Sequence, residues 1–326
     1  MNLTNAKKLF LILGITVFLL GSLMTISHIK YGLGIILVGI VLLVLMLISK
    51  VYSNIISTNE NEITNYPNIS QSFGITGIVI SGILLLSPVN FVLNGMIGKE
   101  ASMFIYYLLA IGIPLSIVYS IRKSKTNISS FNVTFENKRI IPYIIIGSVV
   151  LSFGIASPIV SSIPVPESIK KVLLEMGSQT GILAFILMVI AAPVMEELIF
   201  RGIILDGLLK NYSPLKSILI SSLLFGISHL NPWQFVSALF IGIFSGWVYY
   251  KTRSLLPSII IHAAVNLIGY LMKFILSVDS FKDESVLEMY GGLTNLILAI
   301  LGSIIIASFC VYFLIKEFNK ADVVRI

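Results

Sequence analysis

Two adjacent glutamates, Glu196 and Glu197, lie in an otherwise apolar stretch of the chain, residues 181–205. Arg201 follows the second glutamate by four residues. An ionisable side chain at the centre of a membrane costs roughly 2.5–3.5 kcal/mol on insertion scales. Such side chains usually face a protein interior or a water-filled cavity, and they mark functional sites. The glutamate pair is therefore the first candidate for chemistry in this sequence.

The two glutamates are expected to have different roles. Neighbouring side chains on a helix point about 100° apart, so the two carboxylates should not serve one spot. Glu197 and Arg201 have i and i+4 spacing, which places them on one face, where they can form an ion pair. Glu196 then remains to face a cavity and to act as a general base.

Two of the three histidines in the chain lie in apolar segments that follow the glutamates. His229 comes one turn after Phe225, and His262 comes one turn before Asn266. Attack of water on an amide requires a base, a proton donor and hydrogen-bond donors for the oxyanion. With Glu196 as the base, His229 can share and transfer the proton. His262 and Asn266 can donate hydrogen bonds to the oxyanion.

This scheme requires no cofactor. The sequence contains no HExxH motif, so the usual helical spacing of zinc proteases is absent. Glu and His side chains on separate helices can still bind a metal ion, and a zinc-dependent reaction stays open as the less favoured alternative. The single cysteine, Cys310, excludes a disulfide within the chain.

The composition indicates a polytopic membrane protein of all-α class. The chain is 56% apolar and 11% charged, whereas soluble domains carry about 25% charged residues. Stretches of about 18 or more apolar residues can cross the ~30 Å hydrocarbon core of a bilayer as helices. We expect about ten such helices, the seventh of them short, at residues 9–27, 32–49, 73–95, 102–121, 140–163, 181–205, 215–230, 233–250, 255–276 and 291–315.

The net charge is +7, and the lysine and arginine residues lie mostly at the ends of these segments. If the N-terminus is cytoplasmic, most of these residues fall on inner flanks, as the positive-inside rule requires. We therefore expect a multi-pass protein of the cell membrane with both termini in the cytoplasm. Its surroundings are the lipid bilayer, and nucleic acid is not an expected partner.

Four parts of the chain are distinguished by their polar content. We expect an N-terminal transmembrane hairpin with a polar loop, accessory transmembrane helices, a protease-like core, and an acidic outer loop with a last transmembrane helix. A short interfacial or connecting helix is expected at Glu167–Met176. The expected boundaries of the four parts are 1–72, 73–179, 180–273 and 274–326.

Three motifs in this order resemble those of the CPBP family, which comprises type II CAAX-processing proteases and bacteriocin-processing (Abi) proteins. Residues 196–202 resemble its EExxxR signature, residues 225–229 its FxxxH motif and residues 262–266 its HxxxN motif. Residues 242–258 are also similar, although Arg253 stands where similar sequences often have glycine. The resemblance covers residues 180–273.

The resemblance implies a helical bundle around a water-filled cavity in the membrane, and it implies intramembrane endopeptidase activity. It implies that Glu196 and His229 activate water and that His262 and Asn266 form the oxyanion hole. The residues that would support this site are Glu197, Arg201 and Phe225.

Two other classes of protein compete with an endopeptidase. Intramembrane Glu and His side chains also build proton relays in transporters, but the polar groups here lie only in the second half of the chain. A non-proteolytic scaffold or immunity protein is the other alternative, and it should tolerate Glu196→Gln. GxxxG spacing at Gly242 and Gly246 favours packing within one chain over a dimer contact, and the oligomeric state is left open.

The expected substrate is a peptide or a membrane protein. The Ile-, Asn- and Lys-rich composition is typical of a low-GC bacterium, in which prenylated CAAX substrates are not expected. Processing of a peptide for secretion, signalling or bacteriocin self-immunity is therefore favoured.

Overall fold

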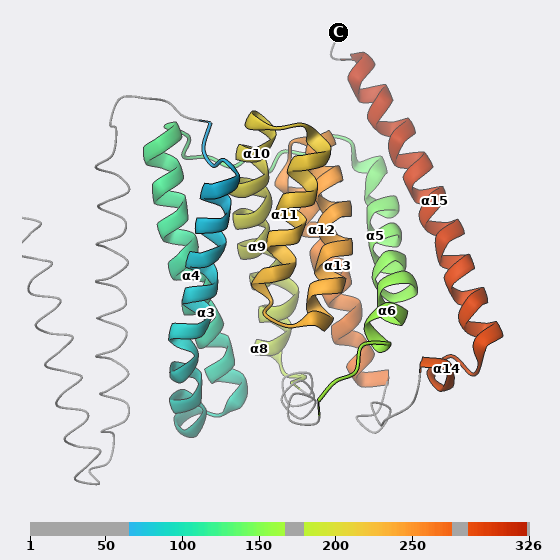
Figure 1. Cartoon of the computed structure of the whole chain (residues 1–326), viewed down its shortest axis with the longest axis horizontal. Helices are drawn as coiled ribbons and strands as arrows, with labels where there is room; N and C mark the ends of the chain where they lie inside the picture. Colours follow the sequence, from blue (N-terminus) through green and yellow to red (C-terminus); the bar gives the residue numbers. More distant parts are fainter. Residues whose placement is uncertain (1–64, 167–178, 276–285, 325–326) are drawn as a thin grey trace, which may run out of the picture. The chain divides into compact units, whose positions relative to one another are not determined.

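A computed structural model describes residues 65–166, 179–275 and 286–324, and these residues form helices joined by short connections (Figure 1). The first two predicted spans and the predicted helix at Glu167–Met176 lie outside the described residues. The helices before residue 179 are α3 (Ile69–Ile97), α4 (Lys99–Thr126), η1 (Lys138–Ile140), α5 (Ile141–Val149), η2 (Val150–Ala156) and α6 (Ser157–Ser161). The later helices are α8 (Ile182–Phe185), η3 (Ile186–Ala191), α9 (Ala192–Glu197), η4 (Leu198–Leu205), α10 (Asp206–Asn211), α11 (Pro214–Ser228), α12 (Pro232–Thr252), α13 (Leu255–Ile275), α14 (Val286–Met289) and α15 (Leu293–Val324).

The described helices include several that are long and apolar enough to cross a membrane. Six meet both criteria: Ile69–Ile97, Lys99–Thr126, Lys138–Ser161, Ile182–Asn211, Leu255–Phe274 and Leu293–Lys320. Helix α11 is apolar but has only 15 residues. Helix α12 has 21 residues but is not apolar enough to be counted. The expected all-α, multi-pass membrane class is confirmed, whereas the count of ten spans is not.

The chain divides into two compact units. In the first unit, the described residues 77–129 form a hairpin of α3 and α4. A Cβ atom at Gly82 would lie 2.5 Å from the Ala110 carbonyl oxygen, so this glycine allows close approach of the two backbones. The Tyr106 hydroxyl also donates a hydrogen bond to the Ile83 carbonyl, at 2.8 Å. Small residues and a cross-helix hydrogen bond therefore hold this hairpin together.

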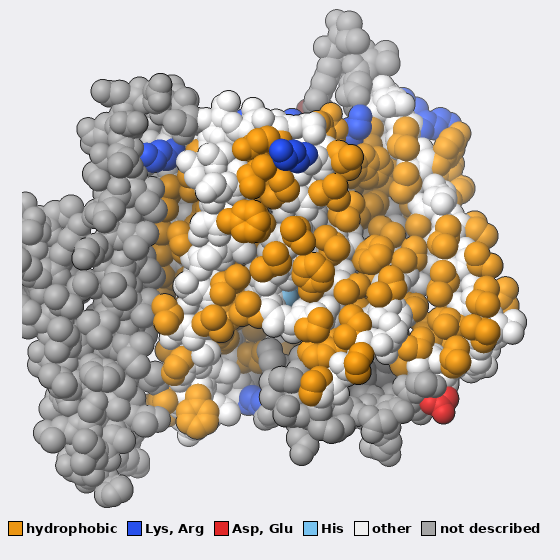
Figure 2. Space-filling model, in the orientation of Figure 1, with side chains coloured by type: hydrophobic (Ala, Val, Ile, Leu, Met, Phe, Trp, Pro, Cys, Tyr) orange, Lys and Arg blue, Asp and Glu red, His pale blue; other side chains and the backbone are white. Residues whose placement is uncertain are grey.

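The second unit comprises residues 67–76 and 130–326, and it contains all the candidate site residues. One of its apolar cores joins α5, α12, α13 and α15 around Ile144, Phe244, Ile261 and Leu314. Figure 2 shows hydrophobic side chains covering the outer face of this unit, while the visible Lys and Arg side chains gather mainly at its upper end. This distribution is typical of a surface in contact with lipid between two polar ends. The predicted boundaries of the four functional parts stay predictions.

Helices α11 and α12 pack closely because small residues face each other. A Cβ atom at Gly242 would lie 2.9 Å from the Cβ atom of Ser222, and one at Gly246 would lie 3.2 Å from Cγ2 of Ile218. The Ser222 hydroxyl is satisfied within α11, since it donates to the Ile218 carbonyl at 2.7 Å. The contact within one chain that we favoured for the GxxxG spacing is therefore confirmed.

Arg253 ends α12 in the left-handed conformation, with φ of 50°. Its backbone N–H donates to the Tyr249 carbonyl at 2.7 Å, which is the usual way to satisfy the last carbonyls of a helix. Glycine adopts this conformation without steric cost. The geometry explains why glycine suits this position in similar sequences.

Candidate active site

The glutamate pair lies at the end of α9, between two segments that are wound as π-helix. Segment η3 precedes α9, and segment η4 follows it. Pro193, in the first turn of α9, has no backbone N–H to donate to the preceding turn. Local π winding often occurs at functional sites, where it changes the direction of side chains. Here it brackets the two carboxylates.

Glu197 and Arg201 form the expected ion pair. Arg201 Nη1 lies 3.1 Å from Glu197 Oε1, and both side chains are fully buried. Arg201 Nη2 also donates to the carbonyl oxygen of Gly242 at 3.3 Å, so the guanidinium is bound to α12 as well. A buried charge is tolerated when it has a counter-charge and hydrogen bonds, and this pair has both.

Glu197 also binds two other helices. The hydroxyl of Ser245, on α12, donates to Glu197 Oε2 at 3.2 Å. On α13, His262 Nδ1 lies 3.1 Å from Glu197 Oε1. One carboxylate thus connects three helices.

Glu196 lies on the other side of the same imidazole ring. Its Oε2 atom is 3.8 Å from Nε2 of His262, and its side chain is 15% exposed. We expected the two glutamates to serve different spots because they diverge on their own helix. In the structure His262 stands between them, with one carboxylate at each ring nitrogen. The two glutamates do diverge on their own helix, but the side chain of His262, from α13, lies close to both carboxylates.

The contact with Glu197 sets the hydrogen-bonding role of His262. A carboxylate that is ion-paired with arginine only accepts hydrogen bonds, so His262 Nδ1 carries a proton. In a neutral ring with this tautomer, Nε2 is an acceptor. His262 can therefore donate through Nε2 to an oxyanion only as an imidazolium.

Phe225 is the aromatic centre of the cluster. The Arg201 guanidinium carbon lies 4.6 Å from the centre of its ring. The imidazoles of His229 and His262 contact the ring edge to face, with centroids at 5.0 and 5.6 Å. The ring therefore packs against the buried cation and both histidines at once.

His229 follows the last residue of α11. Its Nδ1 atom lies 2.9 Å from the Phe225 carbonyl oxygen. Because a carbonyl only accepts, Nδ1 is the donor, and Nε2 is left as the acceptor in the neutral ring. This tautomer is the one that a proton-accepting histidine requires.

Asn266 Nδ2 donates to the carbonyl oxygen of Met188, in η3, at 2.8 Å. This bond uses one of the two amide protons, so the second remains for a ligand. The hydrogen bond also ties α13 to the π-wound segment before the glutamates.

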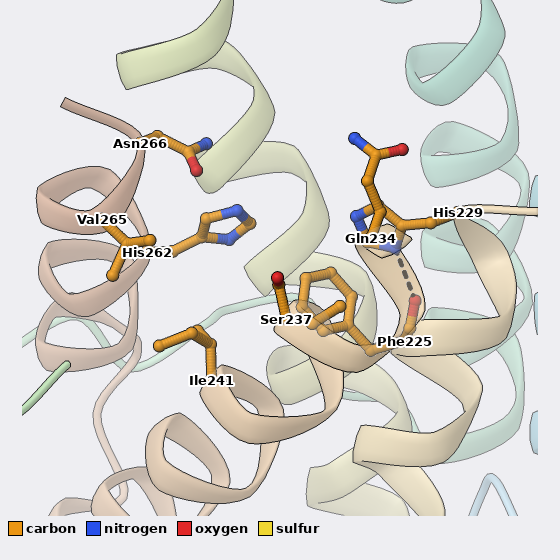
Figure 3. Close-up of a pocket in the computed structure, with 9 residues that line it drawn as sticks. Phe225, His229, Gln234, Ser237, Ile241, His262, Val265 and Asn266 are labelled. Atoms are coloured by element: carbon orange, nitrogen blue, oxygen red, sulfur yellow. Dashed lines mark hydrogen bonds between the residues drawn. The ribbon is translucent and has the colours of Figure 1, made fainter. Parts of the chain in front are cut away.

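A cavity of about 130 Å³ opens between α11, α12 and α13. Figure 3 shows His262 and Asn266 on one side of it and His229 with Gln234 on the other. The residues that line it are Phe225, His229, Gln234, Ser237, Ala238, Ile241, His262, Val265 and Asn266. Glu196 is not among these residues, but its Oε2 atom lies 3.8 Å from Nε2 of His262, which is.

The three sequence motifs therefore meet in space. All seven predicted residues belong to one set of contacts, through His262, Phe225 and the cavity that they line. Sequence reasoning missed Gln234 and Ser237. The only available signal was weak: two polar residues three positions apart near the start of an apolar helix.

Comparison with known proteins agrees with the geometry. Residues 178–268 match the sequence model of the type II CAAX prenyl endopeptidase Rce1-like family. The match covers less than a third of the chain, and over this segment the chain is similar to that family. The matched segment contains all seven predicted residues, and the CPBP resemblance is confirmed. The match supports an intramembrane CAAX-type endopeptidase in general terms.

The chain is also similar to the UPF0177 protein YxdF of Lactococcus lactis subsp. lactis (strain IL1403). The two sequences are 35% identical over 81 residues, which is 24% of this chain and 44% of that protein. The similarity thus spans less than half of the relative's length. No solved structure matches the chain.

Among the residues that the structure describes, no group of three or more His, Cys, Asp or Glu side chains is arranged to hold a metal ion. The polar contacts of Glu197 are with Arg201, Ser245 and His262, and the imidazole of His262 also lies 3.8 Å from Glu196. In the described residues the polar cluster is thus organised by ion pairs and hydrogen bonds.

Proposed function

We propose that this protein is an intramembrane endopeptidase that hydrolyses a peptide bond of a membrane-associated protein or peptide. The observation that carries the proposal is the cavity lined by His229, His262 and Asn266, with Glu196 beside His262. A proton acceptor and two oxyanion donors thus line one space, and the carboxylate that would act as the base lies next to one of those donors. This set of groups meets the requirements for attack by water.

In the proposed mechanism Glu196 takes a proton from water while the hydroxide oxygen attacks the carbonyl carbon. His229, whose Nε2 accepts, orients the water and shares its proton. The imidazolium of His262 and the free amide proton of Asn266 stabilise the tetrahedral oxyanion. The proton held by Glu196 then passes to the leaving amine as the carbon–nitrogen bond breaks. No metal ion is needed for any of these steps.

The supporting residues fix this geometry. Glu197 holds His262 in the required tautomer, and Arg201 pairs with Glu197 at 3.1 Å. Phe225 packs against both histidines and excludes water from the guanidinium. These contacts keep the reacting groups preorganised, so that little rearrangement is needed in the transition state.

We propose that the protein lies in the bilayer of the cell membrane, with both termini in the cytoplasm. Its substrate is a non-prenylated peptide or membrane protein, processed for secretion, signalling or bacteriocin self-immunity. The excess of Lys and Arg at the inner ends of the predicted spans supports the orientation, and the composition typical of low-GC bacteria supports the substrate class.

The test is cleavage of a quenched-fluorescent peptide library by the purified full chain in detergent. Wild type is compared with Glu196→Gln, with His229→Ala and with Glu136→Gln, a matched control at an exposed loop position. Loss of general-base catalysis costs about 10²–10⁴ in rate, so Glu196→Gln and His229→Ala should fall by this amount while Glu136→Gln stays at the wild-type rate.

Each protein is also assayed with a chelator. Cleavage that is indifferent to the chelator supports water activation by Glu196, whereas cleavage abolished by it supports a metalloprotease. If Glu196→Gln retained full function in cells, the protein would be a scaffold or immunity protein and the proposal would be wrong.

A further inference from the structure

Gln234 lines the cavity but belongs to none of the three motifs. It lies in the first turn of α12, opposite His262 and Asn266 across the cavity and next to His229 (Figure 3). Its side chain is exposed at the rim, whereas His262 is buried. A ligand that reaches His262 through this rim would pass the amide group of Gln234.

The backbone determines which way the Gln234 amide points. Asn231 Oδ1 accepts from the backbone N–H of Gln234 at 2.8 Å, and Asn231 Nδ2 donates to the His229 carbonyl at 2.9 Å. These two backbone partners fix the orientation of the Asn231 amide. The same Nδ2 atom also donates to Gln234 Oε1, at 2.5 Å.

Gln234 Oε1 is therefore occupied, and Nε2 is the end of the amide that remains for a ligand. In the part of the chain that the structure describes, the hydrogen bonds of Gln234 to Asn231 involve its Oε1 atom and its backbone N–H. None of them involves Nε2. An amide nitrogen donates two protons and accepts none. The rim of the cavity thus presents a neutral donor whose orientation is set by two backbone groups.

This donor differs from the other two in the cavity. Nε2 of His262 donates only when the ring is an imidazolium, and one proton of Asn266 is already used by Met188. Gln234 donates in every protonation state. A donor of this kind suits a neutral acceptor of the substrate, which is present before negative charge develops in the transition state.

We infer that Gln234 is a substrate-binding residue, and that its Nε2 group donates to a backbone carbonyl oxygen of the peptide next to the scissile bond. The inference rests on the proposed endopeptidase function and assigns this residue to the binding of its substrate. The carbonyl is bound equally in the ground state and in the transition state, so the contact contributes to KM rather than to kcat.

The first test is Gln234→Glu, which retains the shape of the side chain and an oxygen for Asn231 but removes the donor. We expect KM to rise about tenfold with kcat within about threefold of wild type, since one hydrogen bond is worth ~0.5–1.5 kcal/mol. Gln71→Glu is the matched control. Gln71 pairs with Asn68 at the start of α3 in a similar cap. The Gln71→Glu substitution should therefore leave KM unchanged.

The second test leaves Gln234 intact and reverses its amide. In Asn231→Asp one carboxylate oxygen still accepts from the Gln234 N–H, so the helix remains capped. The other oxygen replaces Nδ2 and can only accept, so the bond to the His229 carbonyl is lost, and the Gln234 amide rotates, donates to this oxygen and turns Oε1 towards the cavity. Because His229 is a proposed catalytic residue, the lost bond is expected to change kcat, and KM is the constant that reports the Gln234 amide. KM should rise as it does in Gln234→Glu. A purely structural cap predicts no change in KM for Asn231→Asp.

A binding measurement separates failure of this inference from failure of the proposed function. The same peptide library, carrying a photo-crosslinker, is bound to Glu196→Gln with and without Gln234→Glu. A lower crosslinked fraction in the double variant supports the inference even if wild type cleaves no peptide. Equal crosslinking, or an unchanged KM in both Gln234→Glu and Asn231→Asp, would overturn it.

Discussion

His262 Nδ1 and Glu197 Oε1 are 3.1 Å apart and join α13 to the helix that carries both glutamates. The same oxygen is 3.1 Å from Arg201 Nη1. One carboxylate oxygen thus contacts both the guanidinium of its own helix and the histidine of α13, and it determines which nitrogen of the histidine carries a proton. This dependence makes the second glutamate as important to the site as the first.

Glu197→Gln should destabilise the protein strongly. Removing one partner of a buried ion pair leaves the other charge uncompensated and costs about 3–5 kcal/mol. The thermal unfolding midpoint of the purified chain in detergent should fall, with a parallel loss of cleavage. The double variant Glu197→Gln with Arg201→Gln should be more stable than Glu197→Gln alone. If the stability losses of the two single variants simply added in the double variant, the interaction between Glu197 and Arg201 would be contradicted.

Ser245→Ala should reduce cleavage without unfolding the protein. It removes one of the hydrogen bonds to Glu197, and a bond to a charged group is worth about 1.5–3 kcal/mol. Ser221→Ala is the matched control, because Ser221 donates only to the Phe200 carbonyl, at 2.8 Å. The rates of peptide cleavage by the two variants are measured and compared. A larger loss for Ser221→Ala would show that Ser245 does not position the site.

Asn266→Asp should lower kcat about 10²–10³-fold, the usual cost of removing one oxyanion donor. The substitution keeps the size of the side chain but replaces the amide protons with an acceptor. KM should change little, since the oxyanion exists only in the transition state. Steady-state kinetics measure both constants. A rise in KM with normal kcat would assign Asn266 to ground-state binding instead.

Gly242→Ala should destabilise the packing of α11 against α12 by about 1–3 kcal/mol, because the added methyl group overlaps Ser222. Gly302→Ala is the control, since a Cβ atom there meets nothing within 4 Å in the described structure. Thermal midpoints in detergent give the comparison. Ser222→Gly should restore part of the loss in Gly242→Ala, and failure of this rescue would point to a different contact.

Arg253→Gly should raise stability by about 0.5–1 kcal/mol. The left-handed conformation costs an L-residue ~1–2 kcal/mol, and the greater chain entropy of glycine offsets part of the gain. The thermal midpoint should rise while the cleavage rate stays at the wild-type value. A lower midpoint would mean that the packing of the Arg253 guanidinium against Tyr250, at 5.6 Å, outweighs the backbone strain.

The sequence predicts those parts of the site that depend on one helix. The spacing of Glu197 and Arg201 predicts their ion pair, and the spacing of Phe225 and His229 places these two residues one turn apart, at the end of α11. The position of His262 between the glutamates depends on how α13 packs against α9, which no periodicity in a single segment reports. The all-α membrane class follows from the long apolar stretches, because an apolar segment of this length can cross a bilayer as a helix.

Gln234 shows a second limit of sequence reasoning. A glutamine three residues after an asparagine, with proline between them, is typical of the start of a helix. The pattern agrees with the hydrogen bond from the Gln234 backbone N–H to Asn231 Oδ1, but the cavity beside it is completed by residues of α11 and α13. Only the packed structure brings the amide to the rim.

The ion pair between Glu197 and Arg201 also bears on how the protein is made. Either charge alone would oppose the entry of this span into the bilayer by about 2.5–3.5 kcal/mol. Because both partners lie on the same helix, the span carries the counter-charge of Glu197 with it and does not depend on α12 or α13 for that partner. Ser245 and His262 add contacts from α12 and α13 to a charge pair that a single helix already holds.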